Sequence, residues 1–166
     1  MTTATTTTPI RTPMTTEPPA LLPLLWLASP ALPVGGFSYS EGLEAAVDAG
    51  LVHDEASTAS WLDDQLHLGQ ARSDLAVVAQ AVPAWRSADH ARLQALNTWV
   101  LHTRETHELR LQTEQMGHSL LAWARSLGAA GATLIDAIDA AHLAPPTWPL
   151  AWSAAAAHSG APVRDC

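Results

Sequence analysis

The sequence contains no lysine and only one cysteine, one phenylalanine and one tyrosine among its 166 residues. Eight arginines against sixteen aspartates and glutamates give a formal charge of −8. An acidic chain without lysine is a poor electrostatic match for nucleic acid or anionic lipid, so neither is an expected partner. The single cysteine, Cys166, excludes both an internal disulfide and a cysteine-based zinc site.

Long apolar runs are also missing. The longest one, residues 21–28, contains Pro23 and is far too short to span a bilayer. The N-terminus has no basic start followed by an apolar stretch, so no secretory signal is predicted. We therefore expect a cytoplasmic protein that does not bind a membrane.

The composition changes sharply after the first twenty residues. Residues 1–20 hold nine threonines and four prolines, which cannot build a packed face and predict a disordered tail. Beyond them the chain is rich in alanine and leucine, which favour helices over strands. Residues 21–166 are therefore predicted to form an all-α domain, a single-domain bundle of roughly seven or eight helices.

Helix boundaries follow from caps and breakers. A helix is expected over residues 40–49, capped by Ser38 or Ser40 and ended by Gly50. Asp54 or Ser57 is expected to cap the next helix, with a possible interruption at Gly69. Further helices are expected over residues 133–142 and 150–159.

The longest periodic stretch runs over residues 89–127 and is interpreted as helical. Its expected buried face carries Leu93, Leu96, Val100, Leu109, Met116, Leu120, Trp123 and Leu127. Within it, Arg104 and Glu108 lie four residues apart and would share a helical face. This charged segment is interpreted first as a solvated face, with a ridge for a partner as the alternative.

The glycine pair Gly35-Gly36 does not carry a recognised catalytic motif. It matches neither G-x-G-x-x-G nor G-x-x-x-x-G-K-[ST], and no lysine is present to reach a phosphate. The following Phe37-Ser38-Tyr39 lacks the second glycine and the preceding strand of a nucleophile elbow. Nucleotide binding and serine hydrolase chemistry are therefore not predicted.

The eight histidines do not form a metal motif. No H-E-x-x-H is present, and His102 and His107 would lie about 140° apart around a helix. Glu114 and His118 would share a face, but two ligands make a weak site. No catalytic or metal-binding residues are predicted, and an interaction protein is favoured over an enzyme.

Two segments carry a family resemblance. The first segment, residues 25–44, reads LWLASPALPVGGFSYSEGLE. The second segment, residues 104–120, begins with RETHELR and ends with EQMGHSL. In this order and separation they closely resemble the urease accessory protein UreF, and the resemblance extends over about residues 21–164.

This resemblance implies an all-α chaperone rather than an enzyme. UreF proteins dimerise, bind the accessory protein UreD (UreH in some species) and recruit the GTPase UreG. The assembly delivers nickel to apo-urease, with nickel and GTP handled by the partners, so no directly bound cofactor is expected. The alternatives are a helical adaptor unrelated to urease and, from another class, a small hydrolase or metal-binding enzyme.

The positions that match the two segments are candidate partner-binding residues. We expect the members in the first segment to shape a dimer or partner surface, and the charged members in the second to form interhelix pairs or partner contacts. A glycine inside a helix costs about 1 kcal/mol relative to alanine, so Gly117 needs a packing reason. We expect that it permits close helix approach. The alternative role of each is support of the fold. The candidates are Gly35, Gly36, Phe37, Ser38, Tyr39, Glu41, Gly42, Glu44, Arg104, Glu105, Glu108, Arg110, Gln115, Met116 and Gly117.

The resemblance also implies a difference in length. UreF proteins normally continue into further C-terminal helices, whereas this chain ends at Cys166, shortly after Pro162 could begin another helix. The chain is therefore expected to be C-terminally truncated relative to the family. It should expose an apolar face where those helices would pack.

Overall fold

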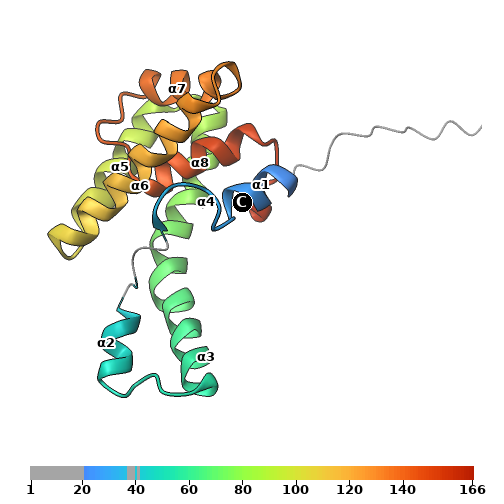
Figure 1. Ribbon diagram of the computed structural model, residues 1–166. Coiled ribbons are helices and arrows are strands. Elements are labelled where there is room, and N and C mark those ends of the chain that lie inside the picture. Colours follow the sequence, from blue (N-terminus) through green and yellow to red (C-terminus); the bar gives the residue numbers. More distant parts are fainter. Residues whose placement is uncertain (1–20, 37–39, 41) are drawn as a thin grey trace, which may run out of the picture.

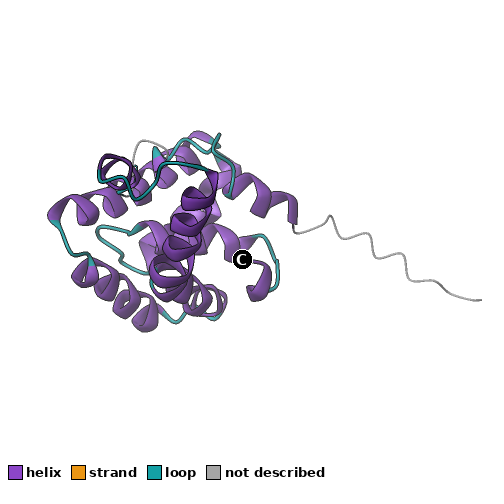
Figure 2. Cartoon of the chain, turned by 90° about the horizontal axis from the view of Figure 1, so that it is seen from below, coloured by secondary structure: helices purple, strands orange, loops and turns teal. Residues whose placement is uncertain are grey.

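The computed structural model describes residues 21–36, 40 and 42–166. Within these ranges the chain forms helices and connecting loops, with no strand, which confirms the all-α prediction (Figure 2). None of the described helices combines the length and the apolar character that crossing a bilayer needs. The tail predicted over residues 1–20 lies outside the described residues.

The α-helices of the described chain are α1 (Leu21–Leu27), α2 (Leu43–Asp48), α3 (Glu55–Asp64), α4 (Asp74–Arg86), α5 (His90–Thr103), α6 (His107–Ser126), α7 (Ala129–Ala140) and α8 (Trp148–His158). From α2 onward the helices follow one another through short connections (Figure 1). A π-helical turn (Gln65–Gly69) and a 3-10 turn (Gln70–Arg72) join α3 to α4, so the chain is interrupted around Gly69, where an interruption was expected. A last 3-10 turn covers Val163–Asp165.

Helix α8 is the centre of the fold. Helices α4 and α6 pack against it most extensively, and α1, α5 and α7 also contact it. Leu150, Ala151 and Ala154 are fully buried, with no exposed surface. A helix that is apolar on all sides belongs in a core, and its alanines let the neighbouring helices approach closely.

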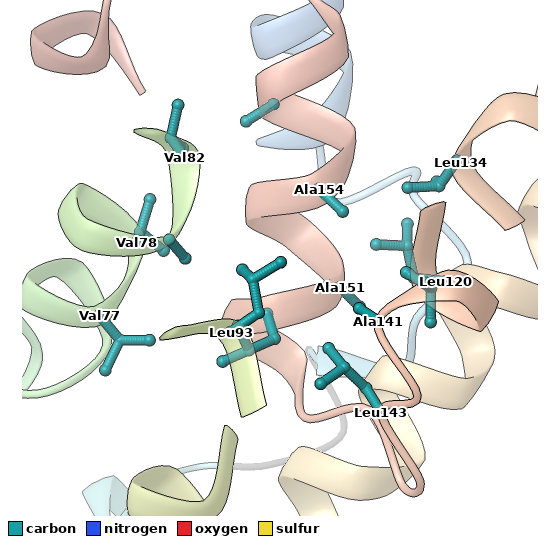
Figure 3. Close-up of a cluster of buried hydrophobic side chains, with 14 of the residues drawn as sticks. Val77, Val78, Val82, Leu93, Leu120, Leu134, Ala141, Leu143, Ala151 and Ala154 are labelled. Carbon is teal, nitrogen blue, oxygen red and sulfur yellow. The ribbon is translucent and has the colours of Figure 1, made fainter. Parts of the chain in front are cut away.

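The side chains that surround α8 come from both sides of it (Figure 3). Val77, Val78 and Val82 project from α4 on one side, while Leu120 of α6 and Leu134 of α7 lie on the other. The predicted core spacing is confirmed on α5, where Leu93, Leu96 and Val100 are buried, and at Leu120. It is wrong at Leu109 and Leu127, which are exposed; Met116 and Trp123 are half-buried.

Residues 42–69, here called the arm, project from the rest of the fold, here called the body (Figure 1). The arm contains α2, α3 and the π-helical turn. Only Ala46 is buried in α2, and none of the ten residues of α3 is buried. The arm therefore has almost no core of its own and is attached mainly through its continuation into α4.

The helix caps of the arm agree with the predicted caps in part. Asp54 caps α3, because its carboxylate accepts from the Ser57 N–H at 2.8 Å and the Ser57 hydroxyl lies 3.0 Å from the Asp54 N–H. This confirms the predicted cap. The prediction for α2 is wrong: its N-cap is Gly42, at φ +93°, and Ser40 makes no side-chain cap. Ser38 lies outside the described residues.

The stretch over residues 89–127 is not one helix. It divides into α5 and α6, since Arg104 has extended backbone angles and Thr106 begins the next helix. The Thr106 hydroxyl accepts from the Leu109 N–H at 3.2 Å. Arg104 therefore does not share a helical face with Glu108, and the intrahelical pair expected there is wrong.

Candidate partner-binding groove

An open groove of about 1080 Å³ lies between the arm and the body. Its arm side includes Gly42, Glu44 and Leu68, and its floor includes the start of α4. Its body side is formed by the α5–α6 junction, the first half of α6 and the start of α8. The groove is thus bounded by elements that are far apart in the sequence.

The groove brings the two resemblance segments together. Gly42 and Glu44 from the first segment and Arg104, Glu105, Glu108 and Met116 from the second all line it. Gly36 lies against the same wall, because a Cβ added there would be 3.1 Å from the Met116 Cε. Six of the candidate residues therefore share one surface, and a seventh contacts it.

The remaining candidates are placed differently. Arg110, Gln115 and Gly117 are on α6 but are not among the residues that line the groove. Gly35 has φ +77°, a left-handed conformation that favours glycine. The other four, Phe37, Ser38, Tyr39 and Glu41, lie outside the described residues.

Arg104 joins the α5–α6 junction to the start of α4. Its guanidinium lies 2.6 Å from the Asp74 carboxylate, and the two side chains are 20% and 24% exposed. Asp74 is in the first turn of α4, where the helix dipole also favours a negative charge. The Arg104 Nε is buried without a hydrogen-bond partner. Arg104 and Asp74 thus form an interhelix ion pair at the groove floor.

The other charged candidates on α6 are more exposed. Arg110 pairs with Glu114 one turn on, at 3.2 Å, an intrahelical arrangement that contributes about 0.2–0.5 kcal/mol. Hydrogen bonds from its own backbone N–H and from the Thr106 hydroxyl hold the pKa of the Glu108 carboxyl below its ordinary value. Glu108 therefore presents a negative charge to the groove at neutral pH.

Gly117 has an internal packing role. A Cβ added there would lie 2.1 Å from the backbone oxygen of Pro146, so only glycine lets α6 approach the loop before α8. Close approach at Gly117 was expected, and the element that it meets is this loop. Gly117 thereby positions the start of α8, which forms part of the groove wall.

A buried polar cluster that the sequence analysis did not identify holds the same loop. The Asn97 amide donates to the Pro145 carbonyl at 2.8 Å and accepts from both the N–H and the hydroxyl of Thr147 at 2.9 Å. The Thr113 hydroxyl accepts from the Trp148 N–H at 3.2 Å. The available signal was Asn97 itself, a polar residue beside Leu96 in an otherwise apolar stripe.

Two tryptophans that were not singled out line the body side of the groove. Trp148 and Trp152 belong to α8, and the Trp152 indole donates to the Leu27 carbonyl at 3.3 Å. Of the other tryptophans, Trp61 and Trp123 are half-buried and Trp99 is 45% exposed. Aromatic side chains with one polar atom are common at binding surfaces.

The groove lining includes one thiol, that of Cys166. Burial raises the pKa of the Cys166 thiol, which keeps it protonated and weakly nucleophilic at neutral pH. Across the part of the chain that the structure describes, no three His, Cys, Asp or Glu side chains are grouped as a metal ion would require. The described groove thus combines carboxylates, arginines and apolar side chains suited to contact with another surface.

Comparison with known proteins identifies the family of the chain. The model of the UreF family matches residues 52–166, more than two thirds of the sequence. The chain belongs to the UreF family. The match includes the second segment, whereas the first segment lies before its start.

Similar proteins carry the same family name. A urease accessory protein UreF from Paracidovorax citrulli is 60% identical over 148 residues, which is 88% of this chain and 58% of that protein. A UreF from a Polaromonas species is 57% identical, covering 89% of this chain and 62% of the relative. A bifunctional urease accessory protein UreEF from Bordetella bronchiseptica is 42% identical over 90% of this chain and 39% of its own length. The chain thus spans about three fifths of the length of its UreF relatives.

Proposed function

We propose that this UreF-family chain is an adaptor in urease maturation. It bridges UreD (UreH) and the GTPase UreG to apo-urease, so that nickel can be inserted. The relatives named urease accessory protein support this role, since two of them align with nearly nine tenths of the chain. The family match leaves an adaptor unrelated to urease as the weaker alternative.

The observation that carries the proposal is the convergence of the two segments on one groove. Glu44 from the first and Glu108 and Met116 from the second face the same space. A surface of charged rim residues around tryptophan and leucine side chains is typical of a protein interface. We assign this groove to the accessory-protein partners.

In this role the chain is not an enzyme, and the partners handle nickel and GTP. The bifunctional UreEF relative supports a role for this chain alongside other accessory proteins, because the name of that relative combines two accessory functions in one chain. Homodimerisation of the longer, family-length protein and action in the cytoplasm belong to the same proposal.

The test is co-purification with the partners. The chain is tagged, co-expressed with UreD and UreG from the same organism, and analysed by size-exclusion chromatography with light scattering. A version extended to family length is examined in parallel. Co-elution of both partners with either version supports the proposal, whereas failure of both versions contradicts it.

A matched pair of variants locates the contact. Leu109→Glu places a charge in the groove, and Leu127→Glu places one on a similarly exposed leucine at the far end of α6. The two positions are about 27 Å apart along the helix, at 1.5 Å per residue. We expect Leu109→Glu to reduce co-elution by about tenfold and Leu127→Glu to leave it unchanged. Equal loss in both variants would argue against the groove.

A further inference from the structure

The negative charge of the chain is concentrated in the arm. Residues 42–69 contain six carboxylates and no arginine, so they carry −6 of the formal charge of −8. Residues 70–166 contain eight carboxylates and seven arginines, and are almost neutral. All six arm carboxylates are exposed: Glu44, Asp48, Asp54, Glu55, Asp63 and Asp64.

The arm also exposes a series of large apolar side chains. Leu62 and Leu66 are 53% and 50% exposed and lie four residues apart, about one helical turn. Val47, Leu51 and Leu68 are at least half exposed as well. Exposed apolar side chains gathered on one projecting element, rather than scattered singly, indicate a contact surface.

Helix α3 lacks the packing that normally holds a helix of its length. It has ten residues with none buried, and isolated helices shorter than about 12 residues are marginal in water. Its capping box satisfies the first turn, but more than half of the Leu62 surface stays exposed on the described chain. A partner that buries this side would therefore stabilise α3 as it binds.

From this combination we propose that the arm is a docking surface for a basic amphipathic protein element, such as a helix with lysine or arginine flanking an apolar stripe. The apolar stripe covers Leu62 and Leu66, and the basic residues face the nearby carboxylates of Glu55, Asp63 and Asp64. The proposal is independent of the urease role, because it concerns the outer arm and the chemistry of its partner.

Charge selects this occupant over a second copy of the chain. Two arms in contact would bring twelve carboxylates together with no arginine, and like charges across an interface oppose association. The arm holds two histidines, His53 and His67, against six carboxylates, which is too few to remove the repulsion. A basic surface instead gains both the apolar contact and the complementary charge.

The experiment uses two synthetic peptides of about 18 residues, or five helical turns. One places leucines on one face and lysines on the others; its analogue replaces every lysine with glutamate. Binding to the 166-residue chain is followed by fluorescence anisotropy from about 0.05 M to about 0.5 M salt. Hydrogen exchange measured by mass spectrometry locates the bound peptide.

The expected result is salt-sensitive binding of the lysine peptide with protection of residues 55–69. The triple variant Glu55→Gln, Asp63→Asn, Asp64→Asn should weaken it by about tenfold, as should Leu62→Ser with Leu66→Ser. The control Asp136→Asn, Asp139→Asn removes exposed carboxylates from α7 and should bind as well as the parent chain, as should Leu127→Ser.

Four results would overturn the inference. The glutamate peptide could bind as tightly as the lysine peptide, or the α7 control could weaken binding as much as the triple variant does. The bound peptide could protect residues outside the arm. The chain could form a salt-insensitive dimer that the Leu62→Ser, Leu66→Ser variant loses. Protection of residues 55–69 in a family-length chain without peptide would also overturn it, because a segment of the longer chain would then cover the arm. None of these outcomes depends on UreD or UreG.

Discussion

Two helices of similar length, α8 in the body and α3 in the arm, are held in different ways. Six of the eleven residues of α8 are buried, whereas none of the ten residues of α3 is. Helix α8 has other helices packed around it, while α3 depends on its capping box and on its continuation into α4. Helix propensity alone therefore does not indicate which segments hold the fold and which are free to meet a partner.

The largest difference should appear on removing a leucine from each region. Leu150 in α8 is fully buried, so Leu150→Ala should lower the free energy of unfolding by about 3 kcal/mol, through lost burial and a cavity. Leu62→Ala in α3 should change it by less than about 0.5 kcal/mol. Urea denaturation followed by circular dichroism measures both. Similar losses would mean that the arm is part of the core.

Glycine substitutions sharpen the comparison. Gly117→Ala should cost about 3 kcal/mol, since the new Cβ would meet the Pro146 backbone and better helix propensity offsets only about 1 kcal/mol. Gly69→Ala in the arm has open space and should change stability by less than about 0.5 kcal/mol. Thermal unfolding of the two variants measures the difference, and a stable Gly117→Ala protein would contradict the close approach.

A smaller loss is expected from the polar cluster of the body. Asn97→Ala removes the partners of the Pro145 carbonyl and the Thr147 N–H, leaving buried polar groups unpaired. We expect a loss of about 2 kcal/mol in the free energy of unfolding. The arm contains no asparagine that could serve as an exposed control. Gln65→Ala, at an exposed position of the arm, takes that place and should be nearly neutral.

The smallest and most local effect concerns the α3 cap. Hydrogen bonds from Ser57 lower the pKa of the Asp54 carboxyl below its ordinary value of 3.8. A lowered folded-state pKa stabilises the fold above the ordinary value, and this contribution is lost as the pH falls through the folded-state pKa. Amides 55–64 should therefore exchange faster, relative to intrinsic rates, on acidification below about pH 4.

The Asp54→Ala variant provides the control for that experiment. It should exchange fast in residues 55–64 at every pH while the body keeps its protection. A wild-type pH dependence that persists in Asp54→Ala would assign the effect to other carboxyl groups.

The body was largely predictable because its signals are local. Leu93, Leu96 and Val100 recur at helical spacing, and burial follows that spacing wherever a neighbour lies opposite. The break between α5 and α6 was missed although Thr106 is a residue type that caps helices. The buried positions also change phase across the break: Val100 and Leu120 would lie about 200° apart on one continuous helix, so this shift was a second, overlooked sign of the three-residue junction.

The groove and the arm depend on contacts that no local pattern records. Glu44 and Glu108 are 64 positions apart, and only the packing of α4, α6 and α8 brings them to one surface. Val47 and Leu62 have the spacing of core residues, yet each is about half exposed because no described element lies over them. The family resemblance supplied six of the residues that line the groove, without indicating how they meet.

The most direct test of the groove assignment is hydrogen exchange of the chain alone and bound to UreD from the same organism. The account predicts added protection at residues 42–44 and 104–116, the two sides of the groove, with α7 unchanged. A complex that forms while its added protection is confined to α7, or lies elsewhere on the body, would contradict the claim that the groove is the partner surface.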